Sequence, residues 1–316
     1  MTGVQTCALP IYFSAGDLIL VAVSGGADSL ALAAAANIEA EKLAIKLLGV
    51  TIDHQLQEGS KAQAEKVDSQ LDFPCIIESV LVEKGDGLEA AARKARYLAL
   101  DNMAKKHGAV AVFLGHTKDD QAETVLLGLA RGSGARSLSG MASVNGIYIR
   151  PFLEISRKET EEACQELGLQ PWQDPHNDDL KFKRVRVRKN VLPILERELG
   201  PGISDALTRS AQLLRDDADA LEQLARAFWE QDQSLEINSL LKLSKAVRTR
   251  VLRIALLQAI KDSSVNAGEN KGSAQLSSEQ VGQVEALVSN WKGQGEVSLP
   301  AGVKVSRISG RLTLSI

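Results

Sequence analysis

The chain has 316 residues, about twice the usual size of a domain, so we expect two domains that each bury a core. The formal net charge of -3 gives no overall attraction for nucleic acid, so an RNA partner requires a local basic patch. No apolar run approaches the roughly 20 residues that span a bilayer. Three widely spaced cysteines indicate neither a disulfide framework nor a metal site. We therefore expect a soluble, cytoplasmic protein with no membrane partner.

Residues 2–11, TGVQTCALPI, resemble the translation of a widely used sequencing adapter. They lack the basic start and the longer apolar core of a signal peptide. We predict that residues 1–11 are an assembly artefact that replaced the native start, which would leave Cys7 without meaning. Finding this stretch intact in a genome would refute the prediction.

Short apolar runs alternate with helical stretches through the first third of the chain. This alternation predicts an α/β fold, a parallel sheet with right-handed crossovers of the Rossmann-like kind. The strands are predicted at 18–23, 47–52, 76–82 and 109–114, and the helices at 30–40, 61–71 and 88–106.

The remainder of the chain is predicted to be mainly helical. A capping-box pattern at Ser156–Glu159 predicts a helix that continues to Leu167. Gly200-Pro201-Gly202 is a strong turn signal, so we place the domain boundary there. The first domain is predicted over 12–200 and a smaller, mainly helical domain over 201–316. In the second domain we predict helices at 203–231, 240–260 and 277–291, a mobile loop at 261–277 and a terminal β-hairpin within 297–316.

The loop SGGADS, residues 24–29, lies between the first predicted strand and helix. Such a loop presents unpaired N–H groups at the positive end of a helix dipole worth roughly half a charge, which favours phosphate. Its glycines allow close backbone approach, its serines add hydroxyls, and Asp28 could orient the loop or hold Mg²⁺. No lysine follows the glycines, which excludes a Walker A loop, and a plain glycine turn with helix caps would explain only some of the string. The predicted phosphate-binding residues are Ser24, Gly25, Gly26, Ala27, Asp28 and Ser29.

A second polar block, GHTKDDQAET at 115–124, follows the strand that ends at Leu114. It would face the same edge of the sheet. Asp120 and Glu123 share a helix face and could grip an ammonium group or a metal, and His116 could bind nucleotide or substrate. Acidic residues in a first helical turn also favour the dipole, which alone would explain them without a further role.

Residues 181–189, KFKRVRVRK, contain six basic residues in nine, with Phe182 interleaved. Contact with RNA phosphates is one use of such a segment. The alternative is a solvated amphipathic helix whose Val and Phe side chains pack inward.

Several of these blocks carry a family resemblance. The 24–29 loop resembles the PP-loop, S-G-G-x-D-S, of ATP pyrophosphatases that adenylate a substrate and release pyrophosphate. The 115–124 block resembles the G-H-x-x-D-D-Q-x-E-T signature of tRNA(Ile)-lysidine synthetases within that group. The similarity covers about residues 18–195, and its combination is specific although single blocks are not. Further blocks agree in order: IDH at 52–54, EAAARKARY at 89–97, RGSG at 131–134, RP at 150–151 and DPHN at 174–177.

The resemblance implies an ATP-dependent ligase. Such enzymes adenylate the C2 carbonyl oxygen of the wobble cytidine in an isoleucine tRNA with a CAU anticodon, and the ε-amine of free L-lysine then displaces AMP to give lysidine. ATP would be the co-substrate, with Mg²⁺ neutralising the pyrophosphate.

The resemblance also implies residue roles. Asp28, Asp120 and Glu123 would be catalytic, the last two positioning and deprotonating the lysine amine. Asp28 would also be the Mg²⁺ ligand, and His54 and His116 would join the PP-loop in binding nucleotide. The implied substrate-binding residues are Arg93, Arg96, Asp119, Arg131, Arg184, Arg186 and Arg188.

The sequence departs from the family pattern at four positions. These departures affect base and tRNA contacts rather than the ATP loop. Gln55 and Gln57 stand where Gly and Arg are usual, Ser137 where Gly is common, and Val185 where Asn is frequent.

Three other functions stay open on the sequence. A PP-loop tRNA thiolase would activate the same kind of carbonyl but generally needs reactive cysteines, and Cys75 and Cys164 lie in no motif. An amidotransferase such as a GMP or NAD synthetase is disfavoured by the helical second domain and the Arg-rich segment. A non-catalytic tRNA-binding protein is disfavoured by the intact loop and Asp120. The apolar helix faces of the second domain could pack within a monomer or across a homodimer.

Overall fold

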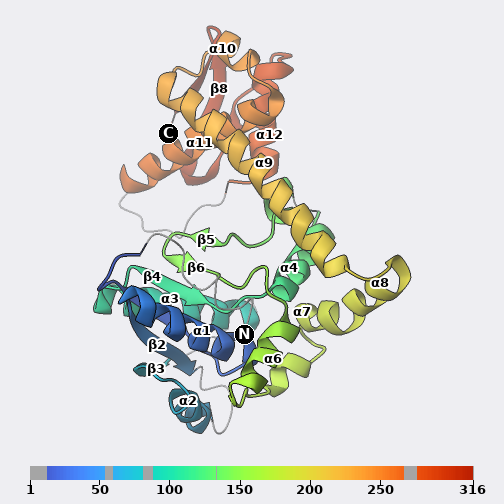
Figure 1. Cartoon of the computed structure of the whole chain (residues 1–316). Coiled ribbons are helices and arrows are strands. Elements are labelled where there is room, and N and C mark those ends of the chain that lie inside the picture. The colour runs from blue at the N-terminus through green and yellow to red at the C-terminus, as the bar shows by residue number, and fades with distance from the viewer. Residues whose placement is uncertain (1–12, 54–59, 81–87, 133, 267–275, 316) are drawn as a thin grey trace. The chain divides into compact units, whose positions relative to one another are not determined.

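The computed structural model describes residues 13–53, 60–80, 88–132, 134–266 and 276–315 (Figure 1). The predicted artefact at 1–11, the predicted nucleotide ligand His54, and residues 267–275 of the predicted loop lie outside the described residues. The chain divides into two compact units, residues 1–214 and 215–316.

A six-stranded sheet of order β3-β2-β1-β4-β6-β5 forms the centre of the first unit. Strand β1 (Leu18–Ala22) pairs in parallel with β2 (Lys46–Asp53) and β4 (Ala111–Leu114), and β3 (Cys75–Ser79) pairs in parallel with β2. The predicted α/β fold with a parallel sheet is confirmed. Two short strands were not predicted because two residues show no periodicity: β6 (Tyr148–Ile149), parallel to β4, and β5 (Val144–Asn145), antiparallel to β6.

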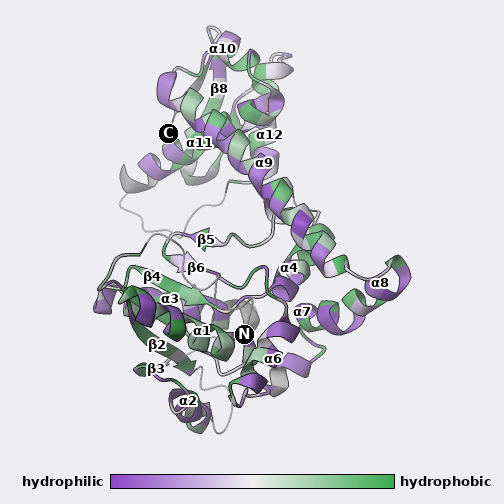
Figure 2. Cartoon of the chain, in the orientation of Figure 1, coloured by the Kyte–Doolittle hydropathy of each residue, from purple (hydrophilic) through white to green (hydrophobic). Residues whose placement is uncertain are grey.

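Helices cover both faces of this sheet, because its central strands are apolar on both sides (Figure 2). Ile19 and Val21 of β1 belong to the core that includes helix α1 (Ala27–Leu43), whereas Leu20 belongs to the core that includes α3 (Leu88–His107). This is the alternation expected of a strand. The other helices of the unit are α2 (Ser60–Asp68), α4 (Lys118–Ala130), α5 (Ala135–Leu138), α6 (Arg157–Glu166), α7 (Lys183–Arg186) and α8 (Leu192–Leu199).

Helix α9 (Ile203–Gln231) starts directly after Gly200–Gly202, and the division between the units lies within it. The helix predicted over 240–260 is wrong as a single element, because it is interrupted at residues 242–244, between α10 (Ile237–Leu241) and α11 (Lys245–Asn266). Ser244 caps the second helix by accepting a hydrogen bond from the Val247 amide at 3.4 Å.

The second unit closes with helix α12 (Ser278–Ser289) and an antiparallel sheet of β7 (Val297–Ser298), β8 (Lys304–Ile308) and β9 (Arg311–Ser315). Strands β8 and β9 form the predicted hairpin, and β7 adds a third strand. The unit has its own apolar core, beside which Arg248 and Glu285 form a buried ion pair at 2.6 Å. In the described part of the chain no helix has the length and apolarity needed to cross a membrane.

Candidate active site

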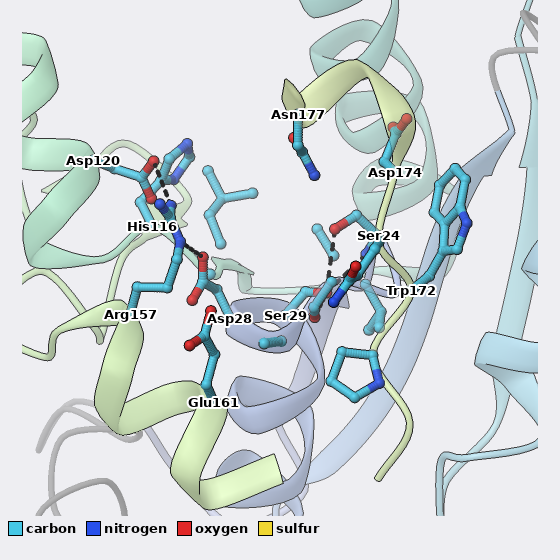
Figure 3. A pocket seen from close by; sticks show the side chains of 18 of the residues that line it. Ser24, Asp28, Ser29, His116, Asp120, Arg157, Glu161, Trp172, Asp174 and Asn177 are labelled. Atoms are coloured by element: carbon cyan, nitrogen blue, oxygen red, sulfur yellow. Dashed lines mark hydrogen bonds and ion pairs between the residues drawn. The ribbon is translucent and has the colours of Figure 1, made fainter. Parts of the chain in front are cut away.

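A pocket of about 1000 Å³ in the first unit opens at the carboxyl ends of β1, β2 and β4 (Figure 3). This is the edge at which open α/β sheets bind ligands. The pocket brings together the two polar blocks that the sequence placed at this edge, and α3, α6 and α7 complete its wall. The predicted site residues in its lining are Ser24, Gly26, Ala27, Asp28, Ser29, Arg93, Arg96, His116, Asp120, Arg184 and Arg188.

The 24–29 loop is shaped by its glycines and by hydrogen bonds between its serines. Ser29 Oγ accepts from the Ser24 amide at 3.1 Å and donates to the Gly26 carbonyl at 2.9 Å. Gly25 has a φ of 86°, and a Cβ there would lie 2.7 Å from Val67 Cγ2. A side chain at this position would clash with Val67, so Gly25 makes the turn possible, although it is not among the lining residues. Helix α1 begins at Ala27, within this loop, so the positive end of the helix dipole lies at the loop.

Asp28 lies in the first turn of α1, and two residues of α6 contact its carboxylate. Its Oδ1 accepts from Thr160 Oγ1 at 2.5 Å, and its Oδ2 lies 3.3 Å from Arg157 Nε. Burial raises the pKa of this carboxyl, against the opposing effects of Arg157 and the Thr160 hydrogen bond.

Asp120 and Glu123 of α4 do lie together, and arginines surround them. Glu123 is fully buried and accepts two hydrogen bonds of 2.6 Å, from Arg184 Nε to its Oε2 and from Arg188 Nε to its Oε1. Asp120 caps α4 by accepting from the Thr117 amide at 2.9 Å. Although burial raises the pKa of Asp120, the nearby Arg184 and Arg157 hold it below its ordinary value.

His116 also lines the pocket, near Asp120. Burial lowers its pKa to about 3, against the opposing charge of Asp120, so the imidazole is neutral at physiological pH. Its Nδ1 is buried and has no hydrogen-bond partner among the described residues. A neutral ring with a vacant nitrogen suits contact with a nucleotide or a base.

The predicted substrate-binding residues differ in their placement. Arg93 stacks over the Tyr97 ring at 5.0 Å, and burial lowers the pKa of its neighbour Arg96. Asp119 lies outside the lining and accepts from the Arg157 amide at 2.7 Å. Arg131 and Arg186 are exposed and also lie outside it.

Several pocket residues were not predicted. Arg157 comes from α6, whose capping box at Ser156 and Glu159 is confirmed, and Thr160 of the same helix bonds Asp28 from outside the lining. That motif indicates where the helix begins, but not that its first turn reaches Asp28, some 130 residues earlier in the chain. The other unpredicted lining residues with polar side chains include Glu161, Gln165, Trp172, Gln173 and Asp178, whereas Asp174 and Asn177 were noted in a motif without a role.

The described residues contain no group of three His, Cys, Asp or Glu side chains that could hold a metal ion. Asp28 is the carboxylate within the 24–29 loop itself. Because Mg²⁺ in nucleotide sites commonly takes one or two carboxylates plus substrate phosphates, Asp28 fits a Mg²⁺ that enters with ATP.

Comparisons with known proteins assign both units. Residues 8–195 match the family described as "PP-loop domain", and residues 235–313 match "TilS substrate binding domain". The chain is 48% identical over 309 residues to the tRNA(Ile)-lysidine synthase of Thermobifida fusca, covering 95% of this chain and 92% of that one. It is also 48% identical over 308 residues to the enzyme of that name from Streptomyces coelicolor, covering 94% and 85%.

Among solved structures, the U34-tRNA thiolase NcsA from Methanococcus maripaludis, described with its [4Fe-4S] cluster, aligns with a TM-score of 0.57 at 16% identity. The alignment covers 67% of this chain and 77% of that one, and it shows a shared fold alone. The PP-loop match places the chain in a family that uses ATP. With its PP-loop domain, its second domain and its near full-length identity to curated relatives, the chain belongs to the tRNA(Ile)-lysidine synthase family.

Proposed function

We propose that the chain ligates L-lysine to C2 of the wobble cytidine of the CAU-anticodon isoleucine tRNA, with ATP converted to AMP and pyrophosphate. One observation carries the proposal: the 24–29 loop and Asp120 line the same pocket. The chain that forms this pocket is 48% identical to a named tRNA(Ile)-lysidine synthase. The loop suits the phosphates of ATP, and the carboxylate suits the cationic second substrate.

The reaction has two balanced steps. The C2 carbonyl oxygen of the cytidine attacks the α-phosphorus of ATP, the bond to the β-phosphate oxygen breaks, and pyrophosphate leaves. The ε-amine of lysine, having lost a proton, then attacks C2, and the C2–O bond breaks with release of AMP. The loop amides and Ser29 would hold the phosphates, while the neutral His116 would contact the nucleotide or base.

Asp120 and Glu123 have separate tasks in this proposal. Asp120 lines the pocket and is ionised, so it is the group that receives the lysine amine. Glu123 lies behind the lining and holds Arg184 and Arg188 in place. Asp28 would hold the Mg²⁺ that enters with ATP, and the ion would supply positive charge to offset that of the pyrophosphate.

A thiolase reaction is disfavoured by the cysteines. Burial raises the pKa of Cys164, which lines the pocket, to about 11, and burial also raises the pKa of Cys75. Thiols with raised pKa values are poor nucleophiles at neutral pH. The cytoplasm as compartment, and the homodimer as assembly state, stay part of the proposal, and sedimentation of the purified chain would test the latter.

The experiment is a direct transfer assay. The full chain is incubated with ATP, Mg²⁺, labelled L-lysine and a CAU-anticodon isoleucine tRNA transcript, and lysine retained on the RNA is measured with AMP released. We expect equal amounts of both, and neither with a transcript whose wobble cytidine is replaced by uridine. A folded protein that transfers no lysine would refute the proposal.

A further inference from the structure

The side chain of Arg157 joins the two halves of the pocket. Its Nε lies 3.3 Å from Oδ2 of Asp28 in the ATP loop, and its Nη2 lies 3.5 Å from Oδ1 of Asp120. Its Nη1 lies 4.0 Å from Oε1 of Glu123. Figure 3 shows the side chain reaching from α6 to the Asp28 and Asp120 carboxylates. One cation therefore spans the phosphate-binding loop and Asp120, the carboxylate assigned to the amine substrate.

This arrangement leaves little room for a second cation. Oδ2 of Asp120 accepts from the Thr117 amide at 2.9 Å and from its hydroxyl at 3.2 Å. Oδ1 of Asp120 lies within 3.5 Å of Arg157, Arg184 and Arg188. Both oxygens of Asp120 thus have partners already, and a lysine ammonium could reach this carboxylate well only if one guanidinium moved away.

The charges of the cluster also balance. The carboxylates of Asp28, Asp120 and Glu123 face the guanidiniums of Arg157, Arg184 and Arg188. Each of these guanidiniums therefore weakens the attraction that Asp120 offers to an incoming ammonium. Withdrawing one of them strengthens that attraction at the place where the amine is needed.

Arg157 is the arginine with the weakest hold on the cluster. Its contacts with the three carboxylates measure 3.3 to 4.0 Å, whereas Arg184 and Arg188 each bind Glu123 at 2.6 Å. Its backbone amide is fixed by Asp119 at 2.7 Å, so its side chain can turn without any movement of α6. Guanidinium groups bind phosphate strongly and often through two hydrogen bonds.

Building on the proposed function, we propose that Arg157 is a positioning residue that couples the two substrates. In the nucleotide-free enzyme its guanidinium occupies the position of the substrate ammonium beside Asp120. When the phosphates of ATP enter the 24–29 loop, Arg157 turns to them and leaves Asp120 to the ε-ammonium of lysine. Lysine thus binds more tightly once ATP is bound, and each substrate raises the affinity of the other by the same factor.

Calorimetric titration of L-lysine into the full chain tests this coupling, with and without α,β-methylene-ATP and Mg²⁺. In the wild type, the analogue should tighten lysine binding about tenfold, the size of a moderate coupling between sites. Arg157→Gln should tighten lysine binding about tenfold without the analogue, because the competing charge is gone, and the analogue should then add little. Arg157→Lys, which keeps the charge, should show a smaller gain.

Two controls isolate the charge effect. Lys158→Gln changes the next residue of α6, an exposed lysine 3.6 Å from Glu162, and should behave like the wild type. Norleucine, which lacks the ε-ammonium, should gain nothing from Arg157→Gln. Weaker or unchanged lysine binding by folded Arg157→Gln protein would overturn the inference. If the wild type still transfers lysine to tRNA, the proposed function survives that result, whereas absence of transfer by the wild type would refute the function itself.

Discussion

At the scale of single residues, the site depends on charges placed inside the protein. Glu123 is fully buried, and its stability there depends on Arg184 and Arg188, whose side chains are about one quarter exposed. Burying a carboxylate is costly unless it is paired and hydrogen-bonded, and both conditions are met here. The same two arginines thereby become fixed features of the pocket.

Glu123→Gln should therefore destabilise the protein strongly. Removing one partner of a buried ion pair typically costs 3–5 kcal/mol, and we expect a loss of about 3 kcal/mol because the arginines reach solvent. Urea denaturation measures this loss. Glu162→Gln, which removes an exposed pair with Lys158, should change the free energy of unfolding by less than about 0.5 kcal/mol. Similar losses in both variants would contradict the buried pairing.

His116 should make stability depend on pH. Its folded-state pKa of about 3 lies below the ordinary value of 6.5, so the folded state binds fewer protons than the unfolded state between these values. Stability must then fall as pH falls below 6.5, by about 2 kcal/mol at pH 5. Urea denaturation at pH 7.5 and pH 5 should show this loss in the wild type and a smaller one in His116→Gln. Equal losses would show that His116 is not buried as a neutral ring.

At the scale of elements, the sequence predicted those features that depend on residues close together in the chain. The apolar runs of β1, β2 and β4 and the capping boxes of α6 and α12 were predicted because each depends on neighbouring residues. The contact of Arg157 with Asp28 could not be predicted, since it depends on α6 packing beside α1. The basic segment is likewise divided by tertiary contacts, with Arg184 and Arg188 turned to Glu123 and Arg186 exposed.

The two capping boxes offer a matched test of what α6 contributes. Ser156→Ala and Ser277→Ala each remove a side-chain cap, and each should lower the free energy of unfolding by about 1 kcal/mol. Only Ser156→Ala should also slow lysine transfer, because the first turn of α6 carries Arg157 and Thr160 against Asp28. Urea denaturation and the transfer assay measure the two effects. Equal slowing by Ser277→Ala would contradict a special role of α6.

At the scale of the whole molecule, the net charge of -3 conceals two basic stretches. One is the 181–189 segment of the first unit. The other is residues 237–261 of the second, which hold six Lys and Arg residues and no Asp or Glu. Among those six, Arg248 forms the buried ion pair with Glu285, whereas Lys242, Lys245 and Arg253 are exposed. A tRNA long enough to touch both units would find phosphate partners on each.

Neutralising three exposed members of each stretch should therefore weaken tRNA binding additively. One variant replaces Lys181, Lys183 and Arg186 by glutamine, and a second replaces Lys242, Lys245 and Arg253. Affinity falls as salt rises, and each lost phosphate contact should make the slope of log affinity against log salt concentration shallower by about 0.7 to 0.9. The slope of each triple variant should therefore be shallower by about 2.

The measurement is filter binding of the CAU-anticodon transcript over a range of salt concentrations. Arg226→Gln and Lys304→Gln, whose residues pair with Glu222 at 3.4 Å and Glu296 at 2.6 Å, serve as controls and should leave the slope nearly unchanged. Combining the two triple variants should add their losses, because the contacts lie on separate units and share no partners. If only one set changed the slope, the tRNA would be held by one unit alone.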